Sequence, residues 1–476
     1  MLNKLKNNPF EYISYFLIFC IYISTINNSF FWDTIQLGSR HANYYFTNNF
    51  SNLLLPQTID SGHIPAFGMY IGFFWKCFGR TLLVSHLAMF PFVLGIIWQL
   101  KKLLSFYFDK KYLGLAFLLI ILDPTLLSQI TLISPDVALV FFFLFSWNSI
   151  INNNKILLSI GIILLFLTSM RGMMVSFCLF LIDIFYNLNS KKTFKNIFNF
   201  SLKRSIIYLP ALLLFISFSI YHYIEKGWIG FHSDSPWAEC FERVDNIKGF
   251  IFNLGILTWR ILDFGRIGIW IVFSILVLIY KQKIFKDKSI YPLVFIFICF
   301  LIILPSNMVW AKNLLGHRYL LPIYITFAIL VAKILFSTST NLKLRKVLTI
   351  IWLLFIVSGN FWVYPNKISQ GWDSSLANLP YFNLREQAMQ YIENHDIDIS
   401  EVATFFPNLS TIDDIDLNND FNKFKSYTKG DKYLIYANVY NISDEVYDDI
   451  CNNYTLIKEF KSPTVHMGIY KINSND

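Results

Sequence analysis

The stretch EYISYFLIFCIYISTINNSFFWDTIQLGSR, residues 11–40, passes from a long apolar run into the pair Trp32 and Asp33. Its apolar part could cross about 30 Å of hydrocarbon as a helix that rises about 1.5 Å per residue. The basic start MLNKLKNN is followed by no small-residue cleavage site, so we expect a permanent membrane anchor rather than a removable signal. A carboxylate placed where the chain leaves the membrane is costly unless it is solvated or paired, and therefore suggests a function.

The rest of the chain up to about Val363 has the same apolar character. Of 476 residues, 55% are hydrophobic and only 15% are charged, which is far from the composition of a soluble globular protein. The sequence therefore predicts an α-helical polytopic membrane protein, multi-pass in the cytoplasmic membrane, with membrane lipids as neighbours. It contains no basic soluble domain, so nucleic acid is not an expected partner.

The positive charges predict the orientation, because Lys and Arg in short loops stay on the cytoplasmic side. Placing all the basic clusters inside gives about eleven spans, a cytoplasmic N-terminus and an exported C-terminus. The clusters are Lys4 and Lys6; Lys101, Lys102, Lys110 and Lys111; Lys191, Lys192, Lys195, Lys203 and Arg204; Lys281, Lys283, Lys286 and Lys288; and Lys343, Arg345 and Lys346. The predicted spans are residues 10–26, 81–99, 113–133, 137–152, 156–170, 172–185, 205–222, 266–280, 289–305, 318–336 and 346–363.

Residues 27–80 and 223–265 are expected to be exported loops of a transmembrane domain that covers residues 1–365. Within the first, the apolar run between His63 and Lys76 is only twelve residues long, too short to span, so HIPAFGMYIGFFWKCFG is expected to form a juxtamembrane helix on the outer face. Residues 366–476 alternate helical and strand patterns, which predicts a small exported α/β domain. Its helices are LREQAMQYIEN and SDEVYDDICNN, and its strands are EVATFF, KYLIYANVY, YTLIKEF and HMGIYKI.

Two acidic residues are predicted at the outer boundary, Asp33 and Asp136 in LISPD. Each could simply cap a helix N-terminus. The functional alternative is a general base, because a carboxylate beside an aromatic wall can accept a proton from a bound hydroxyl. The two could also share a divalent cation, although no recognised ligand spacing supports a metal site.

Two arginines are predicted at the same level, Arg171 at the tip of a short helical hairpin and Arg318 in GHRYLLPIY. A guanidinium group binds phosphate oxygens at two points, which suits a phosphate whose lipid tail lies in the bilayer. The alternative is that both side chains snorkel to lipid headgroups. Asp123, in LIILDPTLLSQI, is interpreted as a structural group that pairs beside the helix break at Pro124.

In their order, these motifs resemble the GT-C class of membrane glycosyltransferases, and in particular the protein mannosyltransferase and lipid A aminoarabinose transferase superfamily. The resemblance rests on WDTIQLGSRHANYYF, DSGHIPAFGMYIGFFWKCFGRTLLVSH, LISPDVALVFFFLF, LTSMRGMMV and GHRYLLPIY. It implies a GT-C fold and an inverting transfer of a hexose or pentose from a polyprenyl-phosphate carrier. The acceptor would be a lipid, glycan or protein on the outer face of the membrane.

The resemblance also assigns roles to individual residues. Asp33 matches the acidic residue that serves as catalytic base, and Asp136 matches a second acidic position. Candidate contacts to the carrier phosphate are Arg171, Arg318, Tyr319, His63 and Lys76. Thr34 follows Asp33 where the family often has a second acid, and Ile64 precedes Pro65 where it has a double proline, so the sugar, the acceptor and the need for a metal stay open.

Two alternative functions make different predictions. A flippase or transporter of lipid-linked sugars would place polar residues at the bilayer midplane and carry paired broken helices in two similar halves. An O-antigen polymerase or ligase would depend on a large exported loop with Arg and His rather than on an acidic first loop. The loop 223–265 is long enough to act as a flap over a substrate. Pairing of the exported cysteines Cys240 and Cys451 stays open.

Overall fold

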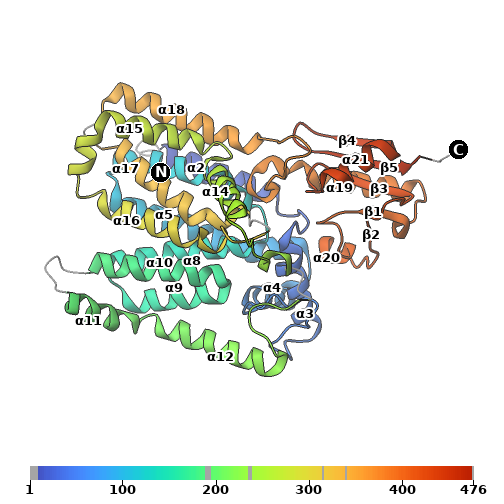
Figure 1. The fold of residues 1–476 in the computed structure, drawn as a ribbon, viewed down its shortest axis with the longest axis horizontal. Coiled ribbons are helices and arrows are strands. Elements are labelled where there is room, and N and C mark those ends of the chain that lie inside the picture. Colours follow the sequence, from blue (N-terminus) through green and yellow to red (C-terminus); the bar gives the residue numbers. More distant parts are fainter. Residues whose placement is uncertain (1–8, 188–193, 234–237, 313–315, 338–339, 474–476) are drawn as a thin grey trace.

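The computed structural model describes residues 9–187, 194–233, 238–312, 316–337 and 340–473. A bundle of long helices forms one part of the molecule, and a small mixed sheet with its helices projects from one end of the bundle (Figure 1). The basic residues Lys4, Lys6, Lys191 and Lys192 lie outside the described residues.

Apolar helices recur along the predicted transmembrane domain, which confirms the polytopic helical class. Among the described residues, four helices are long and apolar enough to cross a membrane, or up to six if each bent pair counts as one span; four further apolar helices are shorter. The helices of the bundle are α2 (Pro9–Ser24), α5 (Leu82–Tyr107), α6 (Lys110–Ile121), α7 (Pro124–Ile130), α8 (Pro135–Ile151), α9 (Lys155–Thr168), α10 (Met170–Asn187), α11 (Phe194–Ser205), α12 (Leu209–Lys226), α15 (Ile267–Lys286), α16 (Tyr291–Ile303), α17 (Leu321–Leu335) and α18 (Leu342–Ser358).

The predicted span over residues 113–133 forms two helices, which separate at the break that the sequence indicates at Pro124. The chain bends by 73° between α6 and α7. Pro124 begins α7, and the Asp123 carboxylate accepts hydrogen bonds from the backbone N–H groups of Thr125 and Leu126. A proline lacks the N–H that would continue the α6 ladder, so the local sequence ends one helix and caps the next. A second bend, of 58°, separates α11 from α12.

The first loop folds into short helices at the end of the bundle nearest the sheet. They are η1 (Ile35–Arg40), α3 (His41–Thr47) and α4 (Ala66–Phe78), and the last confirms the helix predicted in HIPAFGMYIGFFWKCFG. Helix α4 packs closely on α3, because a Cβ on Gly68 would lie 2.4 Å from the His41 Cβ. The second loop contains α13 (Ala238–Phe241) and α14 (Ile247–Leu262).

The C-terminal part contains a five-stranded mixed sheet in the order β2-β1-β3-β5-β4. The strands are β1 (Val402–Thr404), β2 (Lys425–Ser426), β3 (Tyr433–Ala437), β4 (Tyr454–Lys461) and β5 (His466–Ile472). β1 pairs in parallel with β2 and β3, whereas β5 pairs antiparallel with β3 and β4. Helices α19 (Pro380–Asn394) and α21 (Asp444–Asn453) fall where the sequence predicts them.

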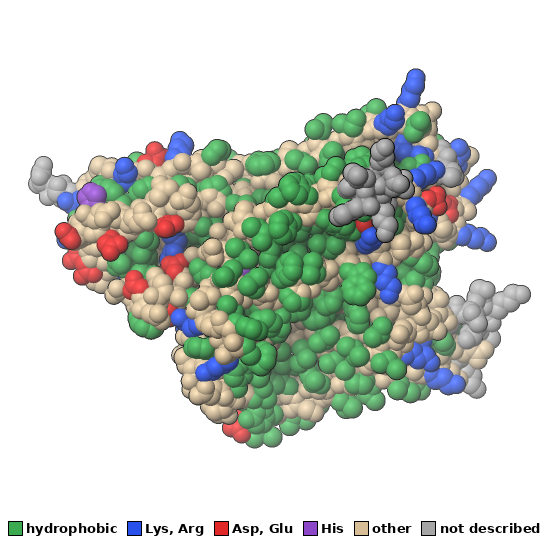
Figure 2. Space-filling view, turned by 180° about the vertical axis from the view of Figure 1, so that it is seen from behind, with side chains coloured by type: hydrophobic (Ala, Val, Ile, Leu, Met, Phe, Trp, Pro, Cys, Tyr) green, Lys and Arg blue, Asp and Glu red, His purple; other side chains and the backbone are tan. Residues whose placement is uncertain are grey.

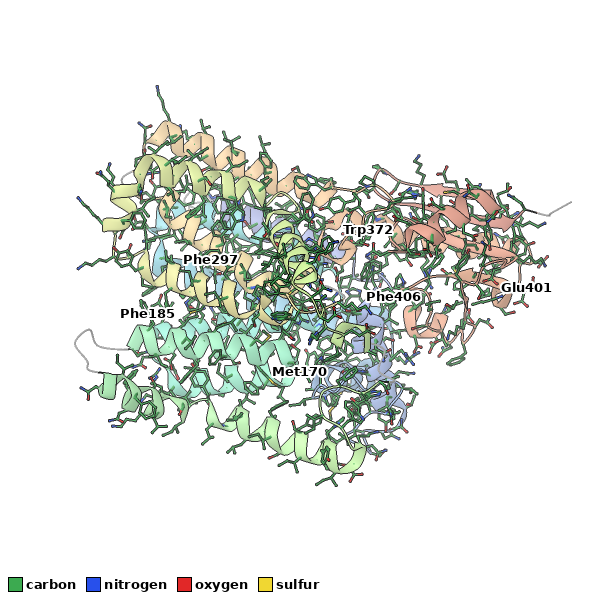
Figure 3. The ribbon with its side chains drawn as sticks, viewed as in Figure 1. Met170, Phe185, Phe297, Trp372, Glu401 and Phe406 are labelled. Atoms are coloured by element: carbon green, nitrogen blue, oxygen red, sulfur yellow. The ribbon has the colours of Figure 1, made fainter. Side chains whose placement is uncertain are left out.

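The bundle and the C-terminal part share one hydrophobic core at their junction. Phe31 from the first loop and Leu132, which follows α7, are buried together with Trp372, Tyr381 and other residues of the C-terminal part. Trp372 lies where the two parts meet (Figure 3). The C-terminal part therefore packs directly against the residues that flank Asp33.

The charges are distributed along the long axis of the molecule. Lys and Arg side chains gather at the end of the bundle opposite the C-terminal part. A broad hydrophobic face lies between this basic end and the C-terminal part (Figure 2). The helix ends that carry the described basic clusters lie at that end (Figure 1). This distribution is the one on which the predicted orientation rests.

Candidate active site

A cavity of about 180 Å³ opens at the end of the bundle nearest the C-terminal part. Five separate segments supply its polar walls: the first loop, the tip of the α9–α10 hairpin, the second loop, the turn η2 (Pro305–Asn307) after α16, and the turn η3 (His317–Leu320) before α17. Its polar and charged lining residues are Asp33, His41, Ser61, His63, Thr168, Ser169, Arg171, Arg243, Asn307 and Tyr319. Four of the residues singled out from the sequence, Asp33, His63, Arg171 and Tyr319, therefore face one space.

Asp33 stands at an abrupt change of backbone direction. Trp32 has a φ of 54°, in the left-handed region that a non-glycine residue rarely adopts, and the π-helical turn η1 follows directly. The Asp33 carboxylate forms an ion pair with the Arg318 guanidinium, and its side chain remains 24% exposed. Asp33 is therefore not merely a helix cap, because its carboxylate is directed to Arg318 and remains open to the cavity.

Arg318 is the centre of the ionic cluster. Its guanidinium group pairs with Asp33 and Asp373, and its Nε lies 3.2 Å from Asp136 Oδ2. The side chain is only 8% exposed, so three carboxylates surround a nearly buried cation. Burial strengthens such charge-assisted contacts, but it makes the loss of any partner expensive.

Asp136 connects the two arginines. Ser134 caps α8 by accepting from the Asp136 N–H, which leaves the Asp136 carboxylate free to pair with Arg171 and Arg318. The Arg171 guanidinium stacks on the Tyr319 ring, with its Cζ 3.6 Å from the ring centroid. It donates one hydrogen bond, to Asp136, and its side chain is 19% exposed to the cavity. Further N–H groups of Arg171 are therefore available to a ligand.

The tip of the α9–α10 hairpin is unusually tight. A Cβ added to Gly172 would lie 1.9 Å from the Leu165 carbonyl oxygen, so only glycine fits at this position. The close approach lets α10 begin immediately after α9 and presents Arg171 at the cavity wall.

Sequence reasoning missed Asp373, the third carboxylate of the cluster. It lies in the turn η5 (Trp372–Ser374), and its side chain is 3% exposed. Gln129 Nε2 donates to the Asp373 carbonyl at 2.7 Å, and Thr125 Oγ1 donates to the Ser374 carbonyl at 3.1 Å, which fixes the turn against α7. The only sequence signal is a second Trp-Asp pair, at Trp372 and Asp373, which repeats that of Trp32 and Asp33.

Two histidines of the first loop are held neutral at the cavity. Burial lowers the pKa of His41 to about 4, and its Nε2 lies 2.7 Å from the Ile59 carbonyl oxygen. Burial, and then the nearby Arg171 charge, lower the pKa of His63 to about 4. The Nδ1 atom of His63 has no partner among the described residues, so it can interact with a ligand in the cavity.

Two other residues singled out from the sequence lie away from the cavity. Lys76 donates to Asn49 Oδ1 at 2.6 Å on the exposed side of α4, and it does not line the cavity. Asp123 pairs with Arg266 at 2.7 Å, which agrees with its structural interpretation. Cys451 is free, and the side chain of Cys240 lies outside the described part.

Comparisons with known proteins give a likeness in structure only. No family model and no curated protein matches the sequence. The structure is similar to that of ArnT from Cupriavidus metallidurans bound to undecaprenyl phosphate, with 8% sequence identity and a TM-score of 0.47. It is also similar to the apo state of the same protein, with 9% sequence identity and a TM-score of 0.48. Each alignment covers 96% of this chain and 97% of the other. ArnT is a lipid A aminoarabinose transferase.

Proposed function

We propose that this protein is an inverting glycosyltransferase that moves a sugar from a polyprenyl-phosphate carrier to an acceptor on the outer face of the membrane. One observation carries the proposal: Asp33 and Arg171 line the same cavity at one end of an apolar bundle. Such a transfer needs a carboxylate that is open to the cavity and can act as a base, and a guanidinium whose free N–H groups can bind the phosphate. Undecaprenyl phosphate, the ligand of one ArnT structure, is a lipid of the proposed class.

The guanidinium of Arg171 would bind the carrier phosphate. As the bond between the sugar C1 and the phosphate oxygen breaks, negative charge grows on that oxygen, and the Arg171 N–H groups stabilise it. Stacking on Tyr319 and the ion pair with Asp136 hold the guanidinium plane in one orientation. The leaving group then departs as a lipid phosphate and needs little acid assistance.

Asp33 would accept the proton of the acceptor hydroxyl. The acceptor oxygen forms its bond to C1 on the face opposite the departing phosphate, so a single displacement inverts the configuration at C1. Arg318 orients the Asp33 carboxylate without enclosing it, because Asp33 remains partly exposed. His63, which is neutral and has an unpaired Nδ1, can position a sugar or phosphate oxygen.

The arrangement favours arginine over a metal ion as the partner of Asp33 and Asp136. Both carboxylates pair with Arg318, whose charge occupies the space between them. Among the described residues, no group of three His, Cys, Asp or Glu side chains is arranged to hold a metal ion.

The alternatives are supported less well. The two bent helix pairs are the kind of feature that a transporter predicts. However, the buried charges beside them are satisfied within the protein, since Asp123 pairs with Arg266 and Asp183 with Arg204. The second loop does contribute Phe241 and Arg243 to the cavity, as a polymerase or ligase would require, but the acidic first loop faces the same space.

The test compares Asp33→Asn and Arg171→Ala with wild type in membranes of a strain that lacks the gene. The control is Asp448→Asn, an exposed pair with Lys367 on the C-terminal part. We expect Asp33→Asn to insert normally, to lose transfer by about 100-fold or more, and to accumulate the lipid-linked donor. Arg171→Ala should also lose transfer, whereas Asp448→Asn should not. Full transfer by Asp33→Asn would exclude Asp33 as the base and favour transport.

A further inference from the structure

A groove of about 930 Å³ lies outside the candidate active site, between the C-terminal part and the bundle. Helix α19 forms one wall, and α20 (Ile412–Asp416) with the segment after it forms the other. Asn27, Asn28 and Ser29, which follow α2, and Leu82, at the start of α5, close it toward the bundle. Neither the proposed reaction nor the packing of the fold uses this space.

The α19 wall is a stripe of planar polar side chains. Asn383, Glu386, Gln390 and Glu393 recur at intervals of three and four residues, so they share one face of the helix, and all four are exposed. The opposite face of α19 is buried in the core of the C-terminal part, for example at Ala388. The polar stripe is therefore not needed to hold α19 in place.

The facing wall has the same chemistry. Asp416, Asn418, Asp420 and Asn422 alternate along the segment and line the groove. Amide and carboxylate groups accept from, or donate to, two neighbouring hydroxyl groups at once, which is the pattern that the edge of a sugar ring presents. Both walls are therefore suited to a ligand with many hydroxyl groups.

Arg385, between the two walls, has an unused donor. It is 5% exposed, its Nε donates to Asn408 Oδ1 at 2.9 Å, and its Nη1 donates to both Asp416 oxygens at 2.9 and 2.8 Å. Its Nη2 is buried and has no partner in the described part of the chain. An unpaired buried donor destabilises the folded protein, and an oxygen of a bound ligand would satisfy it.

The charge of the groove selects among saccharides. Five carboxylates line it, those of Glu386, Glu393, Asp398, Asp416 and Asp420, whereas the guanidinium of Arg385 is already paired with Asp416. Phosphorylated or uronic-acid sugars would be repelled, while neutral hydroxyls and ammonium groups would be accepted. Phe382 and Met389 offer apolar surface for the C–H face of a ring.

The groove also adjoins the segment that carries the proposed base. Phe382 packs against Phe31, with ring centroids 5.6 Å apart, and Phe31 precedes Asp33 by two residues. We propose that this groove binds a neutral or amino oligosaccharide, and that this saccharide belongs to the acceptor. The binding stands on the groove alone, whereas the acceptor role rests on the function proposed above.

The test uses the full chain in nanodiscs and three hexasaccharide probes: maltohexaose, a chitosan hexamer and hexagalacturonate. Binding is followed by saturation-transfer NMR and calorimetry at low salt. We expect the neutral or the amino probe to bind, and the uronate to bind at least about tenfold more weakly. Failure of both maltohexaose and the chitosan hexamer to bind, or equal binding of the uronate, would overturn the proposal.

A matched pair of variants places the binding in the groove. Gln390→Trp should fill the groove and weaken binding by about tenfold or more, whereas Asn394→Trp, at an exposed position of α19 that does not line the groove, should leave it unchanged. Gln390→Ala, which removes the amide without adding bulk, should act in the same direction. Equal binding by all three variants would overturn the assignment.

Sugar transfer, measured separately in the same membranes, distinguishes the two proposals. Saccharide binding without any transfer would keep the groove and reject the glycosyltransferase. Sugar transfer without saccharide binding would keep the glycosyltransferase and reject the groove as a saccharide site.

Discussion

Arg318 illustrates how a single residue organises the candidate site. One nearly buried guanidinium holds Asp33, Asp136 and Asp373, which come from the first loop, the start of α8 and the segment before the C-terminal sheet. Removing the hydration of one cation and three carboxylates is costly, so the cluster persists only because the charges satisfy one another. The geometry of the proposed base therefore depends on residues far from it in the sequence.

Asp373 should act as a positioning residue for Arg318. Asp373→Asn removes one of the negative charges that pair with the buried Arg318 guanidinium. Arg318 should therefore shift and misalign the Asp33 carboxylate. We expect the kcat of transfer to fall about 10- to 100-fold with little change in the KM for the lipid-linked donor, as is typical when a supporting partner is lost. Asp373→Glu, which keeps the charge, should recover part of the activity.

The control for Asp373 is again Asp448→Asn, an exposed carboxylate of the C-terminal part that pairs with Lys367 and lines neither the cavity nor the groove. Both kinetic constants should match wild type in this variant. If Asp373→Asn also had wild-type kinetics, Asp373 would not be required to position Arg318.

At the scale of elements, close helix contacts and helix breaks set the positions of the charged groups. The tight α9–α10 hairpin presents Arg171, and the break between α6 and α7 brings Thr125 and Gln129 to the turn that carries Asp373. Apolar periodicity predicted the helices, but not their bends. A proline identifies a break, whereas its angle depends on which partner the freed groups find, here Arg266 for Asp123.

Gly172→Ala tests the hairpin. Its Cβ would lie 1.9 Å from the Leu165 carbonyl oxygen, a distance that real side chains do not adopt, so α9 and α10 must separate. We expect a lower yield of folded protein, a melting temperature lower by several degrees, and loss of transfer through displacement of Arg171.

Gly255→Ala in α14 is the matched control, because nothing in the described structure lies within 4 Å of its added Cβ. In a helix interior this change should be neutral or should stabilise the protein by up to about 1 kcal/mol. Thermal unfolding in detergent, followed for both variants, provides the measurement. Equal melting of Gly172→Ala and wild type would mean that the hairpin accommodates the side chain.

The whole molecule has a basic end and an end that carries the sheet and the candidate site (Figures 1 and 2). If Lys and Arg mark the cytoplasmic side, the cavity and the saccharide groove both lie outside the cell. A lipid-linked donor within the bilayer and a hydrophilic acceptor in water would then meet at one boundary. This orientation follows from the charge distribution and stays a prediction.

Labelling with a membrane-impermeant maleimide tests the orientation in a background whose six cysteines are replaced by serine. Lys76→Cys on α4 and Lys458→Cys on β4 should react in intact cells, whereas Lys283→Cys and Lys346→Cys should react only after the membrane is opened. All four positions are exposed in the structure, so protection reports the membrane rather than the protein. The opposite pattern would invert the topology and reject an extracytoplasmic site.

The sequence by itself determined the helical class, the C-terminal sheet elements and the candidates Asp33, Asp136, Arg171 and Arg318. These follow from apolar runs, periodicity and the placement of charges, which are local properties of the chain. Only the tertiary structure decided which charges meet: Asp33 reaches Arg318 across 285 residues, and Asp373 reaches it from the other side. Such pairing depends on how the helices bend and pack, and no local pattern encodes it. Lys76 and Arg171 were both candidate contacts to the carrier phosphate, yet packing placed only Arg171 at the cavity.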